Sequence, residues 1–336
     1  MDKSRFSDGA LGKLQKISIQ EEWDYAFIPE SLPGSWDIPQ AVWPLLVEAR
    51  EELARLDGVG RHMPNYDLLL RPLQQREAIR SSSLEGTYAT PEQLLLFEID
   101  PKEPKSHRDP VNSWKEVFNY GDALRLGQKL LTDLPISLRF IRELHKALMR
   151  GVRGFERDPG NFRRTQVHIG SDRRFIPPPA NEVTESLNKK CSLTKPWLYL
   201  SSYFDKYKDE YIDKLFKVSA HGDWENWISF CLRGTIVASK DAIVRFDALV
   251  KLRETYQNVI RASFRLSQII EGLFKSPIIT IPQVARIHNV SYPTARSDVE
   301  KMVEIGILKK SEMQRRPEVF FAEKILKSAY SDISDE

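Results

Sequence analysis

The stretch that decides the fold covers residues 77–93 and reads EAIRSSSLEGTYATPEQ. It begins as a polar helical pattern, and Gly86 suits its end, because glycine readily adopts the left-handed backbone at which helices stop. Thr90 and Pro91 then signal the start of another helix. The stretch therefore predicts two helices joined by a short turn, with a single acidic side chain, Glu85, beside the stop.

Apolar residues recur at helical spacing along most of the chain. Helices are expected over residues 38–60, 67–86, 90–99, 111–130, 135–154, 197–218 and 223–252. The region up to Arg150 is thus expected to be almost entirely helical. Residues 151–179 differ, because Gly, Pro and alternating apolar residues favour a loop followed by a small hairpin or flap.

The sequence changes character from about Leu266. Residues 277–310 read PIITIPQVARIHNVSYPTARSDVEKMVEIGILKK, a pattern typical of helix, turn and helix, with Ser291 as the cap of the second helix and Gly306 as its stop. Residues 307–322 then favour two short strands with a basic tip. This order of elements is typical of a winged helix-turn-helix.

The composition limits the class of protein. The chain has 336 residues, 41% of them hydrophobic, and a net charge of +3, which permits nucleic acid as a partner without arguing for it. The two cysteines, Cys191 and Cys231, lie far apart without ligand-type spacing, which argues against a disulfide framework or a zinc site. No apolar run reaches membrane length. We expect a cytoplasmic protein with no membrane partner and no metal held by cysteines.

Several separate stretches together resemble the Fic family, in the form in which a helical N-terminal region precedes the Fic core and a winged helix follows. They are EWDYAFIPESLP (22–33), LLVEAREELARLDGVG (45–60), REAIRSSSLEGTYAT (76–90), EVFNYGDAL (116–124), ELHKALMRGVRG (143–154), DPGNFRRTQVHIG (158–170), RFIPPPANEV (174–183), YLSSYFDKYKDEYIDKL (199–215) and GDWENWISFCLRG (222–234). The resemblance implies a mostly α fold: a Fic-type helical domain with a small β-hairpin flap, plus a C-terminal winged helix-turn-helix. The implied domains are 1–100, 101–265 and 266–336.

The resemblance gives the opening stretch a role. Ser81, Glu85 and Gly86 match the family's inhibitory motif, [S/T]-x-x-x-E-[G/N]. In the family, this glutamate pairs with an arginine of the catalytic signature and blocks the γ-phosphate of the nucleotide. The alternative is a solvated glutamate near a helix end. It would then pair with a different arginine, such as Arg80, Arg163 or Arg164, or face water.

Two further sites follow from the resemblance. RFIPPPANEV resembles the flap on which target proteins dock, with Arg174, Phe175, Ile176 and Pro177 as the docking residues. Three tyrosines at i, i+4 and i+8 share one helix face, and the resemblance makes that face a wall of the nucleotide pocket. They are Tyr203, Tyr207 and Tyr211. For these tyrosines, packing in a core or groove remains the alternative.

One part of the family pattern is missing. Fic enzymes carry the signature H-x-F-x-[D/E]-G-N-G-R-x-x-R, in which the histidine is the general base, the acidic residue holds magnesium, and the G-N-G turn and arginines bind phosphate. None of the six histidines of this chain is followed by F-x-[D/E]-G-N-G-R. The stretch that follows the catalytic loop in the family comes within a few residues of Lys190. The catalytic block is therefore expected to be deleted near 190–192.

These observations lead to one functional expectation and two rivals. The resemblance implies an autoinhibited protein adenylyltransferase, which moves AMP from ATP to a hydroxyl side chain of a target protein with Mg²⁺. Without the catalytic block we expect little or no transfer, and retention of ATP and Mg²⁺ is left open. The first rival is a DNA-binding or regulatory partner protein that acts through the winged helix, and the second is a decayed gene product. The target protein is undefined, and a homodimer is left open.

The candidate DNA contacts lie at the start of the second helix of the helix-turn-helix and at the basic tip. Side chains of these types reach phosphates and base edges. They are Ser291, Tyr292, Thr294, Arg296, Arg315 and Arg316. The same helix also carries Asp298, Glu300 and Glu304, which weaken its positive field. A structural helix that mediates protein contacts is the alternative.

Overall fold

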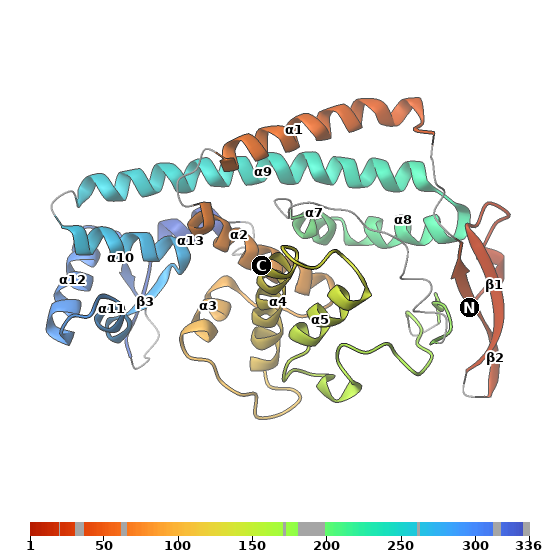
Figure 1. Ribbon diagram of the computed structural model, residues 1–336, viewed down its shortest axis with the longest axis horizontal. Helices are drawn as coiled ribbons and strands as arrows, with labels where there is room; N and C mark the ends of the chain where they lie inside the picture. Colours follow the sequence, from red (N-terminus) through yellow and green to blue (C-terminus); the bar gives the residue numbers. More distant parts are fainter. Residues whose placement is uncertain are drawn as a thin grey trace. The chain divides into compact units, whose positions relative to one another are not determined.

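A computed structural model gives the fold (Figure 1). It describes residues 1–19, 21–30, 37–61, 66–170, 173–180, 199–260, 263–311 and 317–331. The chain forms two compact units, each built from two stretches. The first unit joins Met1–Leu53 to Asp122–Val237, and the second joins Ala54–Gly121 to Ala238–Glu336. The three domains expected from the sequence remain a prediction.

The structure is mostly helical with small antiparallel sheets, which confirms the predicted fold class at that level. Three helices contribute residues to both units: α1 (Trp43–Arg61), α4 (Val111–Leu130) and α9 (Trp224–Val259). Along with α2, α3 and α5, they correspond to the helices predicted between residues 38 and 154 and at 223–252.

The first unit combines a β-hairpin with short helices. Its elements are η1 (Lys3–Arg5), β1 (Gly12–Ile19), β2 (Glu22–Pro29), η2 (Gln40–Val42), α5 (Leu138–Leu148), η3 (Phe155–Arg157), α7 (Ser201–Lys206) and α8 (Lys208–His221). The predicted helix over 197–218 is divided in its described part, because the backbone of Tyr207, at φ −115° and ψ 41°, separates α7 from α8.

The prediction that the region before Arg150 is almost entirely helical is wrong at residues 12–29. Strands β1 and β2 pair there in antiparallel register, from Gly12 opposite Pro29 to Ile19 opposite Glu22. The aromatic residues of β2 alternate along the sequence as strand residues do. The turn lacks the Asn-Gly or Asp-Gly pair that usually announces a hairpin, and instead Glu21 takes a positive φ of 70°.

The second unit contains the elements predicted for the C-terminal part. Its elements are α2 (Tyr66–Leu84), α3 (Pro91–Ile99), α10 (Phe264–Lys275), β3 (Ile278–Thr280), α11 (Ile281–His288), α12 (Tyr292–Glu304), β4 (Lys309–Lys310), β5 (Val319–Phe321) and α13 (Glu323–Tyr330). The three strands form one antiparallel sheet in the order β3-β5-β4. Figure 1 shows α10, α11 and α12 gathered around β3.

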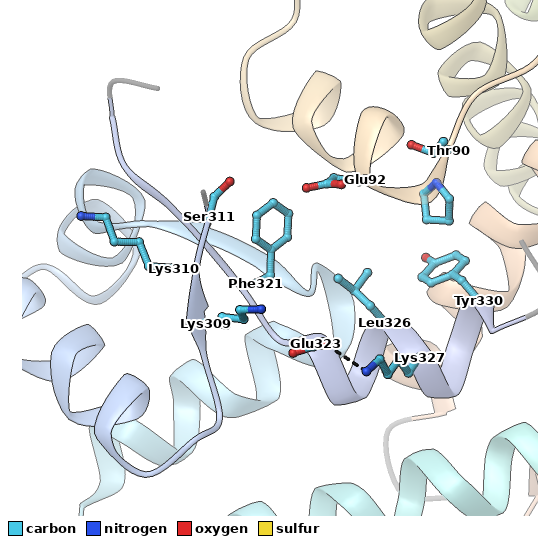
Figure 2. Close-up of a pocket in the computed structure, with 11 residues that line it drawn as sticks. Thr90, Glu92, Lys309, Lys310, Ser311, Phe321, Glu323, Leu326, Lys327 and Tyr330 are labelled. Carbon is cyan, nitrogen blue, oxygen red and sulfur yellow. Dashed lines mark ion pairs between the residues drawn. The ribbon is translucent and has the colours of Figure 1, made fainter. Parts of the chain in front are cut away.

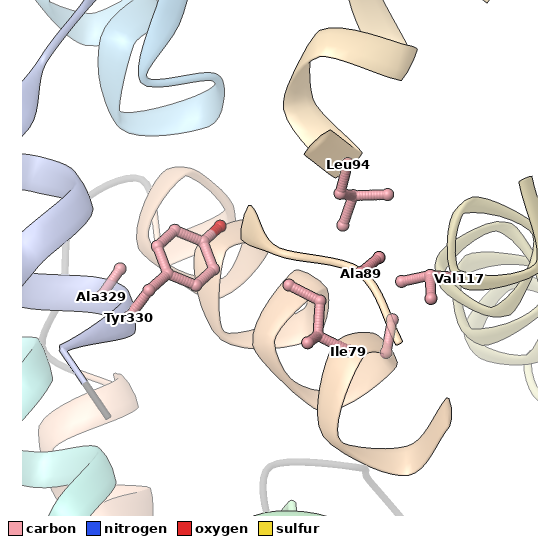
Figure 3. Close-up of a cluster of buried hydrophobic side chains, with 7 residues drawn as sticks. Ile79, Ala89, Leu94, Val117, Ala329 and Tyr330 are labelled. Carbon is pink, nitrogen blue, oxygen red and sulfur yellow. The ribbon is translucent and has the colours of Figure 1, made fainter. Parts of the chain in front are cut away.

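Two hydrophobic clusters hold the second unit together. The first joins α2, α3, α4 and α13, as Figure 3 shows, and contains Ala78, Ile79, Ala89, Leu94, Val117, Ala329 and Tyr330. The other joins α3 to the sheet and contains Leu95, Leu96, Ile278, Val319 and Phe321. Helix α2, which ends at the predicted inhibitory motif, is therefore anchored on helices from distant parts of the sequence.

Candidate functional site

The predicted inhibitory motif lies at the end of α2, and hydrogen bonds explain its glycine. The N–H of Gly86 donates to the carbonyl of Ser83, and the N–H of Thr87 donates to that of Ser82, both at 2.9 Å. This pair of bonds around a glycine with φ of 81° is a Schellman motif. The predicted helix stop at Gly86 is confirmed, so this glycine has a structural reason that needs no ligand.

Glu85 occupies the turn after α2 and is exposed to solvent. Within the described residues, its carboxylate makes no ion pair or hydrogen bond. Two arginines considered as partners are engaged elsewhere in the first unit: Arg163 donates to the carbonyl of Pro178, and Arg164 lies 3.7 Å from the carboxylate of Asp158. The described structure thus leaves Glu85 facing water.

The first residue of the motif, Ser81, faces Tyr120 of α4. Burial, followed by the charge of Glu77, raises the pKa of Tyr120, and a hydrogen bond to Ser81 opposes that rise. The Tyr120 hydroxyl therefore stays protonated and can act as a hydrogen-bond partner at neutral pH. Ser81 thus belongs to the packing of α2 on α4.

A buried polar network fixes α2 from its other side. Arg76 of α2 lies 3.3 Å from the carboxylate of Asp241 in α9, and the same carboxylate accepts a 2.8 Å hydrogen bond from Arg245. Arg245 also donates to the carbonyls of Ser328 and Ala329 at the end of α13. Shared charge-assisted bonds of this kind stabilise a helix position more than isolated ones. The end of α13 is thereby tied to the helix that carries the motif.

The predicted docking flap forms a single antiparallel bridge, with Ile169 and Phe175 exchanging backbone hydrogen bonds of 2.8 and 3.3 Å. Of the predicted docking residues, Ile176 is fully buried, and its carbonyl accepts a 2.8 Å hydrogen bond from the N–H of Phe27. Arg174 places its guanidinium 5.6 Å from the ring centroid of Phe216. The sequence reasoning missed the contact between the flap and β2, because it missed the strand.

The three tyrosines predicted as a pocket wall are part of an aromatic cluster. Tyr203 lies 5.1 Å from Phe230 of α9, and Tyr211 lies 5.8 Å from Trp227, measured between ring centroids. Tyr207 is 39% exposed at the junction of α7 and α8. Burial raises the pKa of Tyr203, as do the charges of nearby acidic groups. Packing thus accounts for Tyr203 and Tyr211, while their role beside a nucleotide remains a prediction.

A pocket of about 630 Å³ lies in the second unit, between the start of α3, strand β4 and helix α13 (Figure 2). Its apolar lining is Pro91, Phe321, Leu326 and Tyr330, and its polar lining is Thr90, Glu92, Lys309, Lys310, Ser311, Glu323 and Lys327. Lys327 is paired with Glu323 at 2.8 Å. Among the described residues, its lining contains no histidine or cysteine. Only the Lys309-Lys310 pair could have signalled it in the sequence.

The model of the N-terminal region of the Fic/DOC family matches residues 43–129. The match begins at the first residue of α1 and ends one residue before the end of α4, and it includes the motif at Ser81, Glu85 and Gly86. Over these residues the chain is therefore similar to the N-terminal region of Fic family proteins. The resemblance inferred from the sequence is confirmed at this level.

Among solved structures, this chain is similar to a crystal structure of a Fic family protein from Desulfovibrio desulfuricans G20. The two chains share 15% sequence identity with a TM-score of 0.48. The alignment covers 85% of this chain and 97% of the other.

The helix-turn-helix predicted from the sequence corresponds in position to α11 and α12. Ser291 caps α12 by accepting a hydrogen bond from the N–H of Thr294, and Tyr292 beside it is 51% exposed. Arg296 is exposed but forms a 2.8 Å ion pair with Glu300. The predicted contacts Arg315 and Arg316, like the expected deletion near 190–192, lie outside the described residues.

One acidic residue of α12 does not face solvent. Asp298 is only 7% exposed and accepts hydrogen bonds from the Nε and Nη2 atoms of Arg265 in α10. This bidentate pair neutralises Asp298 and joins the two helices. The exposed face of α12 is therefore less acidic than its sequence indicates.

Two further features are absent from the part of the chain that the structure describes. Among the described residues, no group of three or more His, Cys, Asp and Glu side chains is placed to hold a metal ion. No described helix combines the length and the apolar character needed to cross a membrane.

Proposed function

We propose that this chain is a Fic family protein that keeps the scaffold of an autoinhibited protein adenylyltransferase but transfers little or no AMP. The sequence carries this proposal: none of its six histidines is followed by F-x-[D/E]-G-N-G-R. Without the signature, the chain lacks the general base, the acidic metal ligand and the phosphate-binding turn that the family uses. Each of these groups contributes a large factor to the rate of transfer.

The same gap bears on ATP and Mg²⁺. In nucleotide sites, magnesium is usually held by one or two carboxylates together with phosphate oxygens. The family's acidic ligand belongs to the signature that this sequence lacks, and the described residues contain no cluster of three metal-binding side chains. The described residues therefore do not fit the metal, and we expect calorimetric titration with ATP and MgCl₂ to detect no micromolar binding.

The direct test of the proposal is incubation of the purified protein with labelled ATP, Mg²⁺ and candidate target proteins. We expect no label on any target. The variant Glu85→Gly should be equally inactive. The family's inhibitory glutamate acts by pairing with an arginine of the catalytic signature, and this sequence lacks that signature. Circular dichroism of the variant controls for folding. Transfer of label by either protein, or a gain in the variant, would show a functional active site and overturn the proposal.

A second candidate function is DNA binding through α11 and α12. The sheet order β3-β5-β4 next to two helices, with the start of α12 exposed, favours it. Affinity for duplex DNA should then fall steeply with salt. It should also fall in Arg296→Ala and Arg315→Ala but not in Lys275→Ala, a control on the exposed surface of α10. An affinity for DNA that changes neither with salt concentration nor in the two arginine variants would exclude this function.

A further inference from the structure

In the first unit, β1 and β2 form a two-stranded sheet, and the flap lies against β2 through one backbone hydrogen bond. The flap residue Phe175 is bridged to Ile169 on one side. The next residue, Ile176, accepts the hydrogen bond from the Phe27 N–H on the other side, and the rings of Phe27 and Phe175 lie 5.9 Å apart. Strand β2 thus occupies this edge of the flap. Within the described residues, the exposed edge of this sheet is the outer edge of β1.

The register of the hairpin shows which backbone groups lie on that outer edge. In an antiparallel pair, residues alternate between those bonded to the partner strand and those whose N–H and C=O point away. The N–H of Phe27 points away from β1, because it bonds to Ile176, and the N–H of Glu30 bonds to Leu11.

The residues opposite Phe27 and every second residue along β1 must therefore point outward. They are Gly12, Leu14, Lys16 and Ser18. Among the described residues, the structure gives their backbone groups no hydrogen-bond partner. A strand edge of this kind is a template for another strand.

The charge along this edge is positive. Lys13 and Lys16 are exposed, and neither forms an ion pair with a described residue. Lys16 places its ammonium 4.6 Å from the ring centroid of Trp23, a tryptophan that is 69% exposed. The carboxylates of β2 are neutralised instead, because Arg173 lies 3.1 Å from Glu22.

We propose that the outer edge of β1 binds an extended acidic peptide segment of a partner protein by strand addition. The backbone of a peptide satisfies the alternating N–H and C=O groups, whereas phosphates offer only acceptors. Lys13 and Lys16 lie on opposite faces of β1. Acidic side chains on one face of the peptide would pair with Lys16 beside the Trp23 ring, and those on the other face with Lys13. A second copy of this chain would instead bring the same lysines together. The proposal rests on the hairpin alone and holds with or without AMP transfer.

Lys13 and Lys16 could instead serve to prevent unwanted strand pairing, as charged residues on edge strands often do. The two readings differ in a binding experiment. The probe is a fluorescein-labelled peptide of three Glu-Glu-Val repeats, which presents acidic side chains on both faces of a strand. Its fluorescence anisotropy is measured against the full-length protein at low salt. We expect saturable binding that weakens with salt.

Proline gives a clean block of the edge. At position 18 the N–H points away from β2, so Ser18→Pro keeps the hairpin bonds and removes only the outward donor. We expect Ser18→Pro to lower the affinity for the probe about tenfold. The matched control, Ser18→Ala, should bind the probe like wild type. Lys16→Glu should weaken the probe about fivefold, and Lys129→Glu, an equal charge change on α4, should not.

Amide hydrogen exchange locates the site independently of affinity. In the free protein, the N–H of Lys16 should exchange fast and that of Ile17 slowly, because only the latter bonds to β2. The probe should protect Lys16. No binding up to about 1 mM probe, equal binding by Ser18→Pro and Ser18→Ala, or a homodimer that Ser18→Pro dissociates would each overturn the proposal. The proposal would also be overturned if duplex DNA displaced the probe and Ser18→Pro bound the probe as tightly as wild type.

Discussion

The hydroxyl of Tyr330 donates a 2.7 Å hydrogen bond to the Oε1 atom of Gln75, and both residues are only 2% exposed. The Nε2 atom of Gln75 donates in turn to Glu98 at 2.8 Å, which fixes the orientation of the amide, since a carboxylate can only accept. Burial, and then the charge of Glu98, raise the pKa of Tyr330 far above its usual range, so its hydroxyl stays a donor. The end of α13 is thereby locked to the middle of α2.

Tyr330→Phe should lower the free energy of unfolding by about 1–3 kcal/mol, because it leaves the buried Oε1 of Gln75 without its donor. Urea denaturation followed by circular dichroism measures this loss. Tyr292→Phe, on the exposed start of α12, should change stability by less than about 0.5 kcal/mol. Equal effects of the two variants would show that the bond to Gln75 contributes nothing.

Gly86→Ala should lower the free energy of unfolding by about 1–2 kcal/mol, because alanine is strained at a left-handed backbone. A Cβ at this position meets no atom within 4 Å, so the cost is conformational and not steric. Gly86→Asn should lose less, since asparagine tolerates this conformation. Thermal melts of the two variants test the order; a more stable alanine variant would contradict the Schellman geometry.

Gly234→Ala should be destabilising by about 1–3 kcal/mol through crowding, although alanine favours a helix. A Cβ at Gly234 in α9 would lie 2.8 Å from the ring of Tyr203. Gly272→Ala in α10 is the matched control, because a Cβ there meets nothing within 4 Å. Urea unfolding should show opposite signs, with the control stabilised. A higher free energy of unfolding in both variants would mean that α7 does not approach α9 this closely.

Cys231 should react slowly with thiol reagents. Burial raises the pKa of its thiol from 9.0 to about 11, so the thiolate fraction at pH 8 falls about 100-fold relative to the unshifted group. Because the folded pKa is raised, any stability gained from the neutral thiol is present below pH 9 and lost as the pH rises toward 11. The variant Cys191→Ser leaves Cys231 as the one cysteine of the sequence. The rate at which this thiol reacts with a chromogenic disulfide is compared between the native and the urea-unfolded variant. Equal rates would refute it.

The sequence predicts the helices well because their apolar spacing and stop signals are local. Gly86 is an example, since its role depends only on the residues within one turn. It does not predict the bond between Gln75 and Tyr330, which are 255 residues apart. Nor does it predict that Arg265 neutralises Asp298, since no local pattern records which distant charges meet.

The candidate site shows the same division. Ser81, Glu85 and Gly86 could be singled out by their spacing, and the end of α2 lies there. The contact between Phe27 and Ile176 could not, because it depends on a hairpin whose turn lacks the usual residues. The period-two alternation of Trp23, Tyr25 and Phe27 was the available signal, and it is shorter than the helical patterns around it.

The strand that covers the flap has a practical consequence for expression of shortened proteins. A chain that begins at residue 43, where the family match starts, would lack β2. It would expose the rings and backbone edge around Phe175 and the side chain of Ile176, and both kinds of surface promote aggregation. Fragments designed for crystallisation should therefore retain the first 29 residues, whose strand β2 contacts the flap.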